Sequence, residues 1–204
     1  EGASKGTPSL ADFVASVSGD SAIRVEESLG NGFVRLRVGE AERRQAKHDI
    51  RCAEDVVIEM LRNSRDAGAH TIFVATNREG DERSIVMIDD GSGLPDSMRK
   101  KIFDARVTSK LDSVHMDRWG VHGRGMALFS IRENSKSSDV MASGVGLGSS
   151  IRVVSDTTAL TERKDQSTWP TIGCGDEGEP RLRGPKNIIR TSCEFALEER
   201  GVCE

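Results

Sequence analysis

Three clusters of residues have types and spacings suited to binding a charged ligand. In the first, Glu59, Asn63 and Asp66 follow one another at intervals of four and three, which places them on one face of a predicted helix. That face adjoins the apolar stripe of the same helix, so we expect the polar groups to point into a cleft. A solvated helix face would show the same pattern, so this cluster does not decide alone.

The second cluster stands where a strand-like apolar run, residues 85–88, passes directly into Asp89, Asp90, Gly91 and Gly93. The end of a buried strand can present a carboxylate rigidly to a ligand. Glycines beside it let a ligand approach the backbone closely. An ordinary strand followed by a turn would also explain these residues.

The third cluster consists of Gly120, Gly123, Arg124 and Gly125, directly before a helix predicted over 126–134. Glycine-rich backbone that leads into a helix N-terminus can cradle a phosphate, because free N–H groups and the helix dipole both favour anions. No strand leads into this cluster as in a dinucleotide-binding fold, and the P-loop pattern GxxxxGK[ST] is absent.

The hydrophobic pattern predicts the elements that must hold these clusters. One helix is expected over 40–67, with a stop at Gly68. The remaining expectations are a helix over 10–17, a hairpin of 23–27 and 33–38, strands 71–75 and 85–88 around a polar loop 77–83, a helix over 96–103, strands 139–142 and 150–154, an irregular stretch 161–186, and a last helix from 189.

Composition indicates a single globular domain. The chain has 204 residues, of which 36% are hydrophobic and 30% charged, and its net charge is −4. We expect a tail over 1–20, the main domain over 21–160, and a C-terminal loop and helix over 161–204 packed on that domain.

Further features bear on location and partners. No apolar run reaches the roughly 20 residues of a membrane span, so no membrane association is expected. The chain has four cysteines: Cys52, Cys174, Cys193 and Cys203. They are far apart in the sequence and form no CxxC motif, which favours reduced thiols in a cytoplasmic chain. The chain contains a small basic cluster: Arg181, Arg183, Lys186 and Arg190. Such a cluster is more typical of a solvated face than of a nucleic-acid site, so it does not decide whether the chain has a nucleic-acid partner.

The order of the three clusters resembles the GHKL, or Bergerat-fold, ATPases over about residues 50–155. That superfamily contains DNA gyrase B-type topoisomerases, ninety-kilodalton heat-shock chaperones, sensor histidine kinases and MutL-type mismatch-repair proteins. Residues 63–69 look like the MutL N-box, residues 107–110 look like its Thr-Ser-Lys lid, and Gly148 with Ser149 is similar to the Gly-Thr that closes the nucleotide site.

The resemblance implies an α+β fold, a two-layer sandwich in which a mixed, mostly antiparallel sheet carries helices on one face. We expect residues 161–200 to cover part of the other face. The resemblance also implies Mg²⁺-dependent ATP binding with slow hydrolysis, and closure of the lid as a conformational switch. A homodimer or a protein partner is implied as well.

The resemblance assigns a role to each matching residue. Glu59 would be the general base, Asn63 would coordinate Mg²⁺, and Asp66 would support the site. Asp89 would accept a hydrogen bond from the adenine amino group, with Ser149 in the water network behind it. The remaining roles are base packing for Gly91 and Gly93, nucleotide contact for Thr108, phosphate wrapping for Gly120, Gly123, Arg124 and Gly125, and contact with the γ-phosphate or the closed lid for Lys110.

One departure from the family pattern and two alternative functions accompany this interpretation. Asp90 stands where relatives carry an Asn near the phosphates, so an extra negative charge could weaken ATP binding. A histidine-kinase-type domain is the first alternative, but His48 lies too close to Asn63 for a separate phosphoacceptor helix pair. Glu59 and Asp66 favour water as the phosphate acceptor. The second alternative is a nucleotide-gated interaction module that does not hydrolyse ATP.

Overall fold

A computed structural model describes residues 25–109, 115–117, 120–122, 125–175 and 178–199. The tail predicted over 1–20 and the helix predicted over 10–17 lie outside the described residues. Lys110, Gly123, Arg124 and Cys203 also lie outside them.

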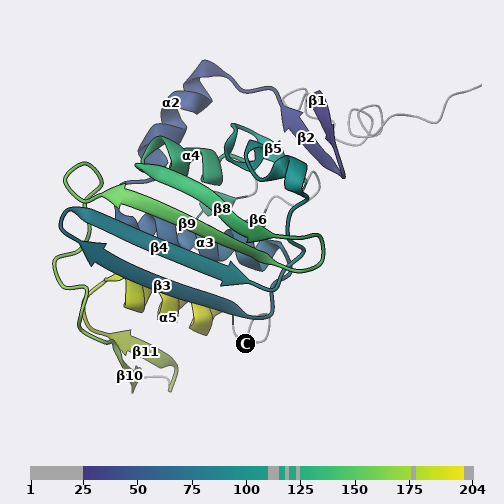
Figure 1. The fold of residues 1–204 in the computed structure, drawn as a ribbon. Coiled ribbons are helices and arrows are strands. Elements are labelled where there is room, and N and C mark those ends of the chain that lie inside the picture. The colour runs from purple at the N-terminus through teal and green to yellow at the C-terminus, as the bar shows by residue number, and fades with distance from the viewer. Residues whose placement is uncertain (1–24, 110–114, 118–119, 123–124, 176–177, 200–204) are drawn as a thin grey trace, which may run out of the picture.

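The main sheet has four strands in the order β3-β4-β9-β8, and each neighbouring pair is antiparallel. The strands are β3 (Ile72–Glu79), β4 (Glu82–Asp89), β8 (Ser137–Ser143) and β9 (Ser149–Asp156). Helices α3 (Ala53–Asp66), α4 (Ala127–Glu133) and α5 (Ile188–Glu198) contribute to one buried cluster with this sheet. Figure 1 shows α3 and α5 behind the same face of the sheet. The predicted two-layer α+β fold is therefore confirmed.

Smaller strand pairs surround this unit. β1 (Val25–Gly30) and β2 (Phe33–Leu36) form the predicted hairpin, which turns through Asn31 at a φ of 51°, and β5 (Val107–Thr108) pairs with β2. β6 (His115–Asp117) pairs with β7 (Gly120–His122). The helix predicted over 96–103 is instead two short 3₁₀ turns, η1 (Asp96–Met98) and η2 (Lys101–Phe103).

The single helix predicted over 40–67 is wrong, because the chain forms α2 (Glu40–Asp49) and then α3. Ile50 is buried in an extended conformation, and Cys52 is extended too. Cys52 forms an isolated parallel bridge with Thr161, and the Ala53 N–H donates to the Thr161 carbonyl at 3.0 Å. A contact with a segment far along the chain therefore fixes the break, and helical periodicity carries no sign of it.

The polar loop predicted over 77–83 is also wrong. β3 and β4 pair without interruption from Ile72↔Asp89 to Glu79↔Glu82, and only Gly80 and Asp81 form the turn. Residues 77–82 are polar or glycine because the end of the sheet at the β3–β4 turn is exposed to solvent. The exception is Arg83, which is buried in an ion pair with Glu162 at 2.7 Å.

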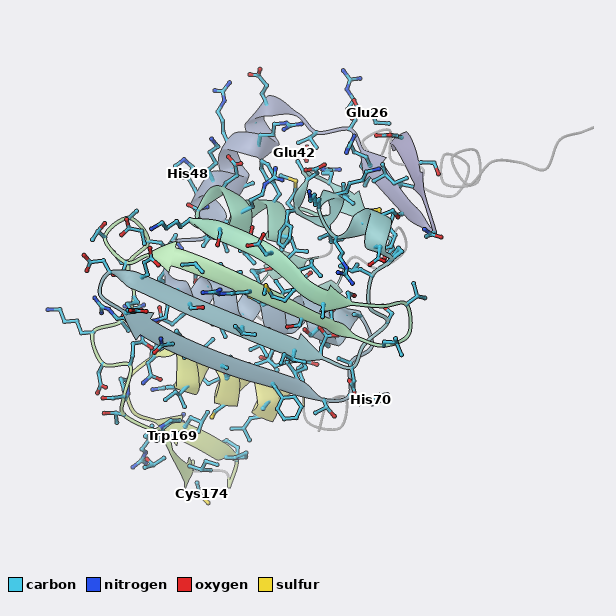
Figure 2. All side chains as sticks on the ribbon, in the orientation of Figure 1. Glu26, Glu42, His48, His70, Trp169 and Cys174 are labelled. Carbon is cyan, nitrogen blue, oxygen red and sulfur yellow. The ribbon has the colours of Figure 1, made fainter. Side chains whose placement is uncertain are left out.

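The C-terminal segment differs from expectation in two ways. The stretch predicted as irregular contains a hairpin, β10 (Thr171–Cys174) and β11 (Pro180–Arg183), and Figure 2 shows Cys174 at its outer end. The segment does not cover the other face of the sheet, because Ile188 and Phe195 of α5 join the core on the α3 side. Phe73 and Ile88, paired neighbours on the open face, remain 65% and 47% exposed.

Cys52, Cys174 and Cys193 are free thiols, and burial raises the pKa of Cys52 to about 11. Within the described ranges, no helix combines the length and the apolar character that crossing a membrane requires.

Candidate functional site

One cavity of about 760 Å³ lies between the helices and the end of the sheet. α3 forms one wall, and the ends of β4 and β9 form another. β5 and the start of α4 close the far side. The cavity brings together most of the residues singled out in the sequence: Glu59, Asn63, Asp66, Asp89, Gly93, Thr108, Gly125 and Ser149. Gly91 is described but does not line it.

Asp89, the last residue of β4, is buried, and hydrogen-bond donors hold both of its oxygens. Oδ2 accepts from the Ser149 hydroxyl at 2.6 Å and from the Ser64 hydroxyl at 3.2 Å. Oδ1 accepts from the Gly91 N–H at 3.0 Å. All three donors are neutral, so they fix the orientation of the carboxylate without adding a positive charge to it.

Ser64 was not predicted as a site residue. It follows Asn63 on α3, and its hydroxyl reaches Asp89 only because α3 packs against the end of β4. The side-chain type was a weak signal, since a serine in a helix more often bonds to its own backbone.

The glycines beside Asp89 are required by the protein backbone itself. Gly93 has a φ of +63°, and a Cβ there would lie 2.0 Å from the Gly144 carbonyl oxygen. A Cβ on Gly148, at a φ of +79°, would lie 1.9 Å from the Asp89 carbonyl oxygen. The sequence interpretation gave Gly93 to a bound base, but the close approach here is between the loop after β4 and the turn between β8 and β9.

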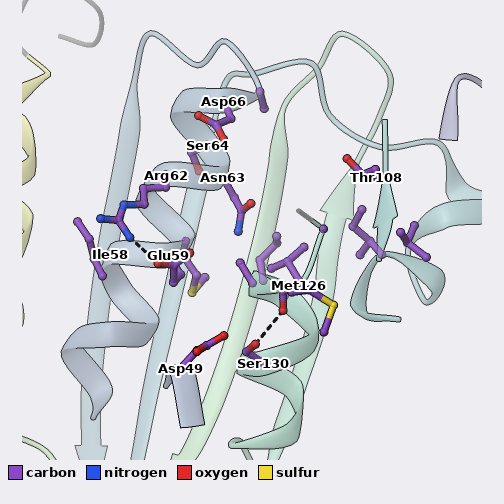
Figure 3. A pocket seen from close by; sticks show the side chains of 18 of the residues that line it. Asp49, Ile58, Glu59, Arg62, Asn63, Ser64, Asp66, Thr108, Met126 and Ser130 are labelled. Carbon is purple, nitrogen blue, oxygen red and sulfur yellow. Dashed lines mark hydrogen bonds and ion pairs between the residues drawn. The ribbon is translucent and has the colours of Figure 1, made fainter. Parts of the chain in front are cut away.

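Glu59 lies on the α3 wall and pairs with Arg62, which the sequence interpretation did not include. The Arg62 Nη1 atom is 2.5 Å from the Glu59 Oε1 atom, and the two side chains are 5% and 19% exposed. Figure 3 shows this pair on the α3 side of the cavity. A spacing of three on a helix suits an ion pair, so this spacing was the available signal.

Asn63 and Asp66 lie further along the same wall (Figure 3). The buried Asn63 Nδ2 atom has no hydrogen-bond partner among the described residues. Asp66 accepts from the Arg65 Nε atom at 2.9 Å, and the Arg65 Nη1 atom donates to Glu199 at 2.6 Å. This chain of charges links the wall of the cavity to the end of α5.

Asp90 does not face the cavity. Its Oδ1 atom accepts from the backbone N–H groups of His70 and Thr71 at 2.8 and 2.9 Å. Hydrogen bonding, first of all from the Thr71 backbone, lowers the pKa of Asp90 below its usual value. The side chain therefore holds the start of β3 against the end of β4, which explains an Asp at this position.

β5 and the residues before α4 form the side of the cavity opposite α3. Thr108 is buried in β5, and Gly125 has a φ of +68° with its carbonyl accepting from the Arg106 N–H at 2.9 Å. Gly120 lies in β7, and α4 begins at Ala127. Whether Lys110, Gly123 and Arg124 join the site stays a prediction.

Comparisons with known proteins point in one direction. The family model of the histidine kinase-, DNA gyrase B-, and HSP90-like ATPases matches residues 50–173. A DNA mismatch repair protein MutL from Anaplasma phagocytophilum is 37% identical over 81 residues, which are 38% of this chain and 12% of that protein. A MutL protein from Halobacterium salinarum is 36% identical over 99 residues, 48% of this chain and 14% of that protein. The chain thus spans a small part of the length of these curated relatives.

Among solved structures, the mycobacterial sensor histidine kinase MprB matches with a TM-score of 0.33 and 16% identity, over 60% of this chain and 74% of that one. The family model covers more than half of the chain, and it includes α3, β4 and β9, the three elements that carry Glu59, Asn63, Asp89 and Ser149. The chain belongs to the histidine kinase-, DNA gyrase B-, and HSP90-like ATPase family.

Proposed function

We propose that this domain binds ATP in a Mg²⁺-dependent manner and hydrolyses it slowly, with closure of the lid segment as a conformational switch. The observation that carries the proposal is the setting of Asp89. A carboxylate is buried at the end of a strand, held by three neutral donors, in a cavity that also contains Glu59 and Asn63.

Asp89 retains the capacity to accept one more hydrogen bond from a ligand. A carboxylate has about four lone-pair sites. The described donors use two on Oδ2 and one on Oδ1. An exocyclic amino group of adenine donates where the carbonyl of guanine only accepts. Asp89 would therefore favour ATP over GTP.

The wall formed by α3 suits a hard metal ion held jointly with phosphates. The oxygen of the Asn63 side chain is a ligand type that Mg²⁺ accepts. Its buried Nδ2 group, which has no partner among the described residues, could donate to a phosphate oxygen. Within the described residues, no three His, Cys, Asp or Glu side chains form a metal group. Mg²⁺ would thus depend on Asn63, water and substrate phosphates, and when bound it would neutralise phosphate charge.

Glu59 is the proposed general base. It lies on the same helix face as Asn63, one turn earlier, so it would orient and deprotonate water beside the phosphates. A carboxylate in this place favours water over a protein side chain as acceptor. Closure of the lid segment would change the surface of the domain. A second copy of the chain or a protein partner would bind according to whether nucleotide is present.

The test is calorimetric titration of the purified chain with a non-hydrolysable ATP analogue and Mg²⁺, with GTP as the control. We expect adenine-selective binding, and a loss of roughly a hundredfold in affinity in Asp89→Asn. A folded chain that binds neither nucleotide, or binds both equally, would contradict the proposal. If the chain binds the analogue but releases no phosphate when it is given ATP, a nucleotide-gated interaction module would remain instead.

A further inference from the structure

Arg62 is a buried cation on the wall of the cavity, where it contacts Glu59. Its side chain is 5% exposed, and its Nη1 atom lies 2.5 Å from the Glu59 Oε1 atom. Both residues line the cavity. Arg65, the next arginine along α3, is bound to Asp66 and Glu199.

We propose that Arg62 restrains Glu59 as a proton acceptor and thereby sets the slow rate of ATP hydrolysis. The inference rests on the proposed function, because it concerns the base of that same site. The Arg62 guanidinium donates to the Glu59 carboxylate, so it uses one of the lone pairs with which that carboxylate would bind water. The ion pair also fixes the direction in which the carboxylate points. Both effects leave Glu59 fewer arrangements in which it could take a proton from the attacking water.

The restraint is built into one helix. Residues at positions i and i+3 are neighbours on a helix surface, so no movement between elements is needed to form the pair or to keep it. An arginine does not lose its proton in a protein, so the positive charge stays in place at every working pH. If the Glu59 carboxylate moved away, the buried Arg62 guanidinium would lose one hydrogen-bond acceptor, which costs free energy. The ion pair should therefore persist when nucleotide enters.

The proposal predicts a gain of function, which loss of structure would not produce. Proton transfer by a well-placed base contributes about a hundredfold to ten-thousandfold to a rate. Releasing a restrained base should recover a small part of this, so we expect Arg62→Met to raise kcat about threefold or more. The affinity for the non-hydrolysable ATP analogue should stay the same.

The matched control is Arg83→Met. Arg83 is also buried and also pairs with a glutamate, Glu162 at 2.7 Å, but it does not line the cavity. Both variants replace a buried guanidinium with a shorter, unbranched apolar side chain, and both should lower the midpoint of thermal unfolding. Only the Arg62 variant should raise kcat.

Arg62→Gln provides the second variant in case Arg62→Met does not fold. Glutamine keeps an amide donor for the carboxylate but has no charge, so kcat should again rise above that of the wild-type chain. The double variant Arg62→Gln, Glu59→Gln should lose the gain, because the gain acts through Glu59.

The outcomes separate this proposal from the proposed function. If the wild-type chain does not bind the ATP analogue, both fail. If it binds, and kcat in the folded Arg62 variants is unchanged or lower, ATP binding stands and the restraint is overturned. A rise in kcat that survives in the Glu59→Gln background would also overturn it, because Arg62 would then act elsewhere.

Discussion

Asp89 and Glu59 are carboxylates in the same cavity, and their different neighbours suit them to different work. Asp89 is held by two hydroxyls and a backbone N–H. Glu59 is held by a guanidinium. Neutral donors orient an acceptor without adding charge to it, whereas a guanidinium brings a full positive charge beside it. We therefore propose recognition of the ligand by Asp89 and a restrained basic role for Glu59.

Replacing Glu59 by Gln is expected to abolish hydrolysis while nucleotide affinity is retained. Glutamine cannot take a proton from water, but its amide oxygen can still accept from the buried Arg62. Alanine would be a poorer choice, since it removes that acceptor altogether. Steady-state phosphate release and calorimetry on the same preparation give the two readings. Equal loss of binding and turnover would remove Glu59 from the role of general base.

Replacing Ser149 by Ala should weaken adenine binding without unfolding the domain. The Ser149 hydroxyl is the nearer of the two that fix Asp89 Oδ2, at 2.6 Å. A hydrogen bond to a charged group contributes about 1.5–3 kcal/mol, so we expect a loss of at least about tenfold in affinity. Ser149→Thr keeps the hydroxyl and should bind normally. If the alanine variant kept its full affinity, the hydroxyl would have no part in positioning Asp89.

At the scale of elements, two short connections hold the end of β4 in place. The loop at 91–94 and the turn at 144–148 touch through bare backbone, and the Gly146 N–H donates to the Ser92 carbonyl at 2.8 Å. The Ser143 hydroxyl bridges them, accepting from the Leu94 N–H at 2.7 Å and donating to the Gly148 carbonyl at 3.0 Å. The position of Asp89 is thus fixed by contact between two turns.

Replacing Gly93 by Ala is expected to destabilise the fold by about 2–4 kcal/mol. The new Cβ would have to move the Gly144 carbonyl oxygen, which would lie only 2.0 Å away. Gly80→Ala is the control. Its φ is +57° and a Cβ there meets nothing within 4 Å, so it reports the left-handed backbone cost alone, about 1–2 kcal/mol. Urea unfolding of both variants measures the difference, and equal losses would exclude the close approach as the cause.

At the scale of the whole molecule, residues after 160 complete the domain. Glu162 joins Arg78 of β3 and Arg83 of β4 at 2.8 and 2.7 Å. The Gln166 Nε2 atom donates to Glu54 of α3 at 2.5 Å, and Phe195 of α5 enters the main core. The C-terminal segment therefore connects the sheet to the helix that carries Glu59 and Asn63, and we propose that it belongs to the same folding unit.

The Glu162 ion pairs should make stability depend on pH. Burial alone would raise the pKa of Glu162, but Arg83 and Arg78 lower it below the usual 4.5. A carboxylate with a lowered folded-state pKa stabilises the fold above its unfolded pKa, and that contribution is lost as the pH falls through the folded value. Glu162→Gln should therefore lose stability at pH 7 and show a smaller further loss from pH 5 to pH 3 than the wild-type chain, measured by urea unfolding. A parallel decline would contradict this coupling.

Much of the site could be predicted from local sequence. Helical spacing placed Glu59, Asn63 and Asp66 on one wall, and the passage from an apolar strand into Asp89 marked the other. Ser64 and Arg62 were missed. The contact of Ser64 depends on the distance between α3 and β4, and the Arg62 pair was available from spacing but competes with many solvated pairs of the same form.

The sequence by itself determined the type and order of the main elements, because apolar periodicity and turn residues act over a few neighbouring positions. Only the tertiary structure decided the break at residues 50–52, the extension of β3 and β4 through their polar end, and the side of the sheet on which α5 packs. Each of these depends on partners distant in the chain: Thr161 for the break, Glu162 for the polar strand end, and α3 for α5. Long-range hydrogen bonds, ion pairs and burial outweigh local propensity at these positions.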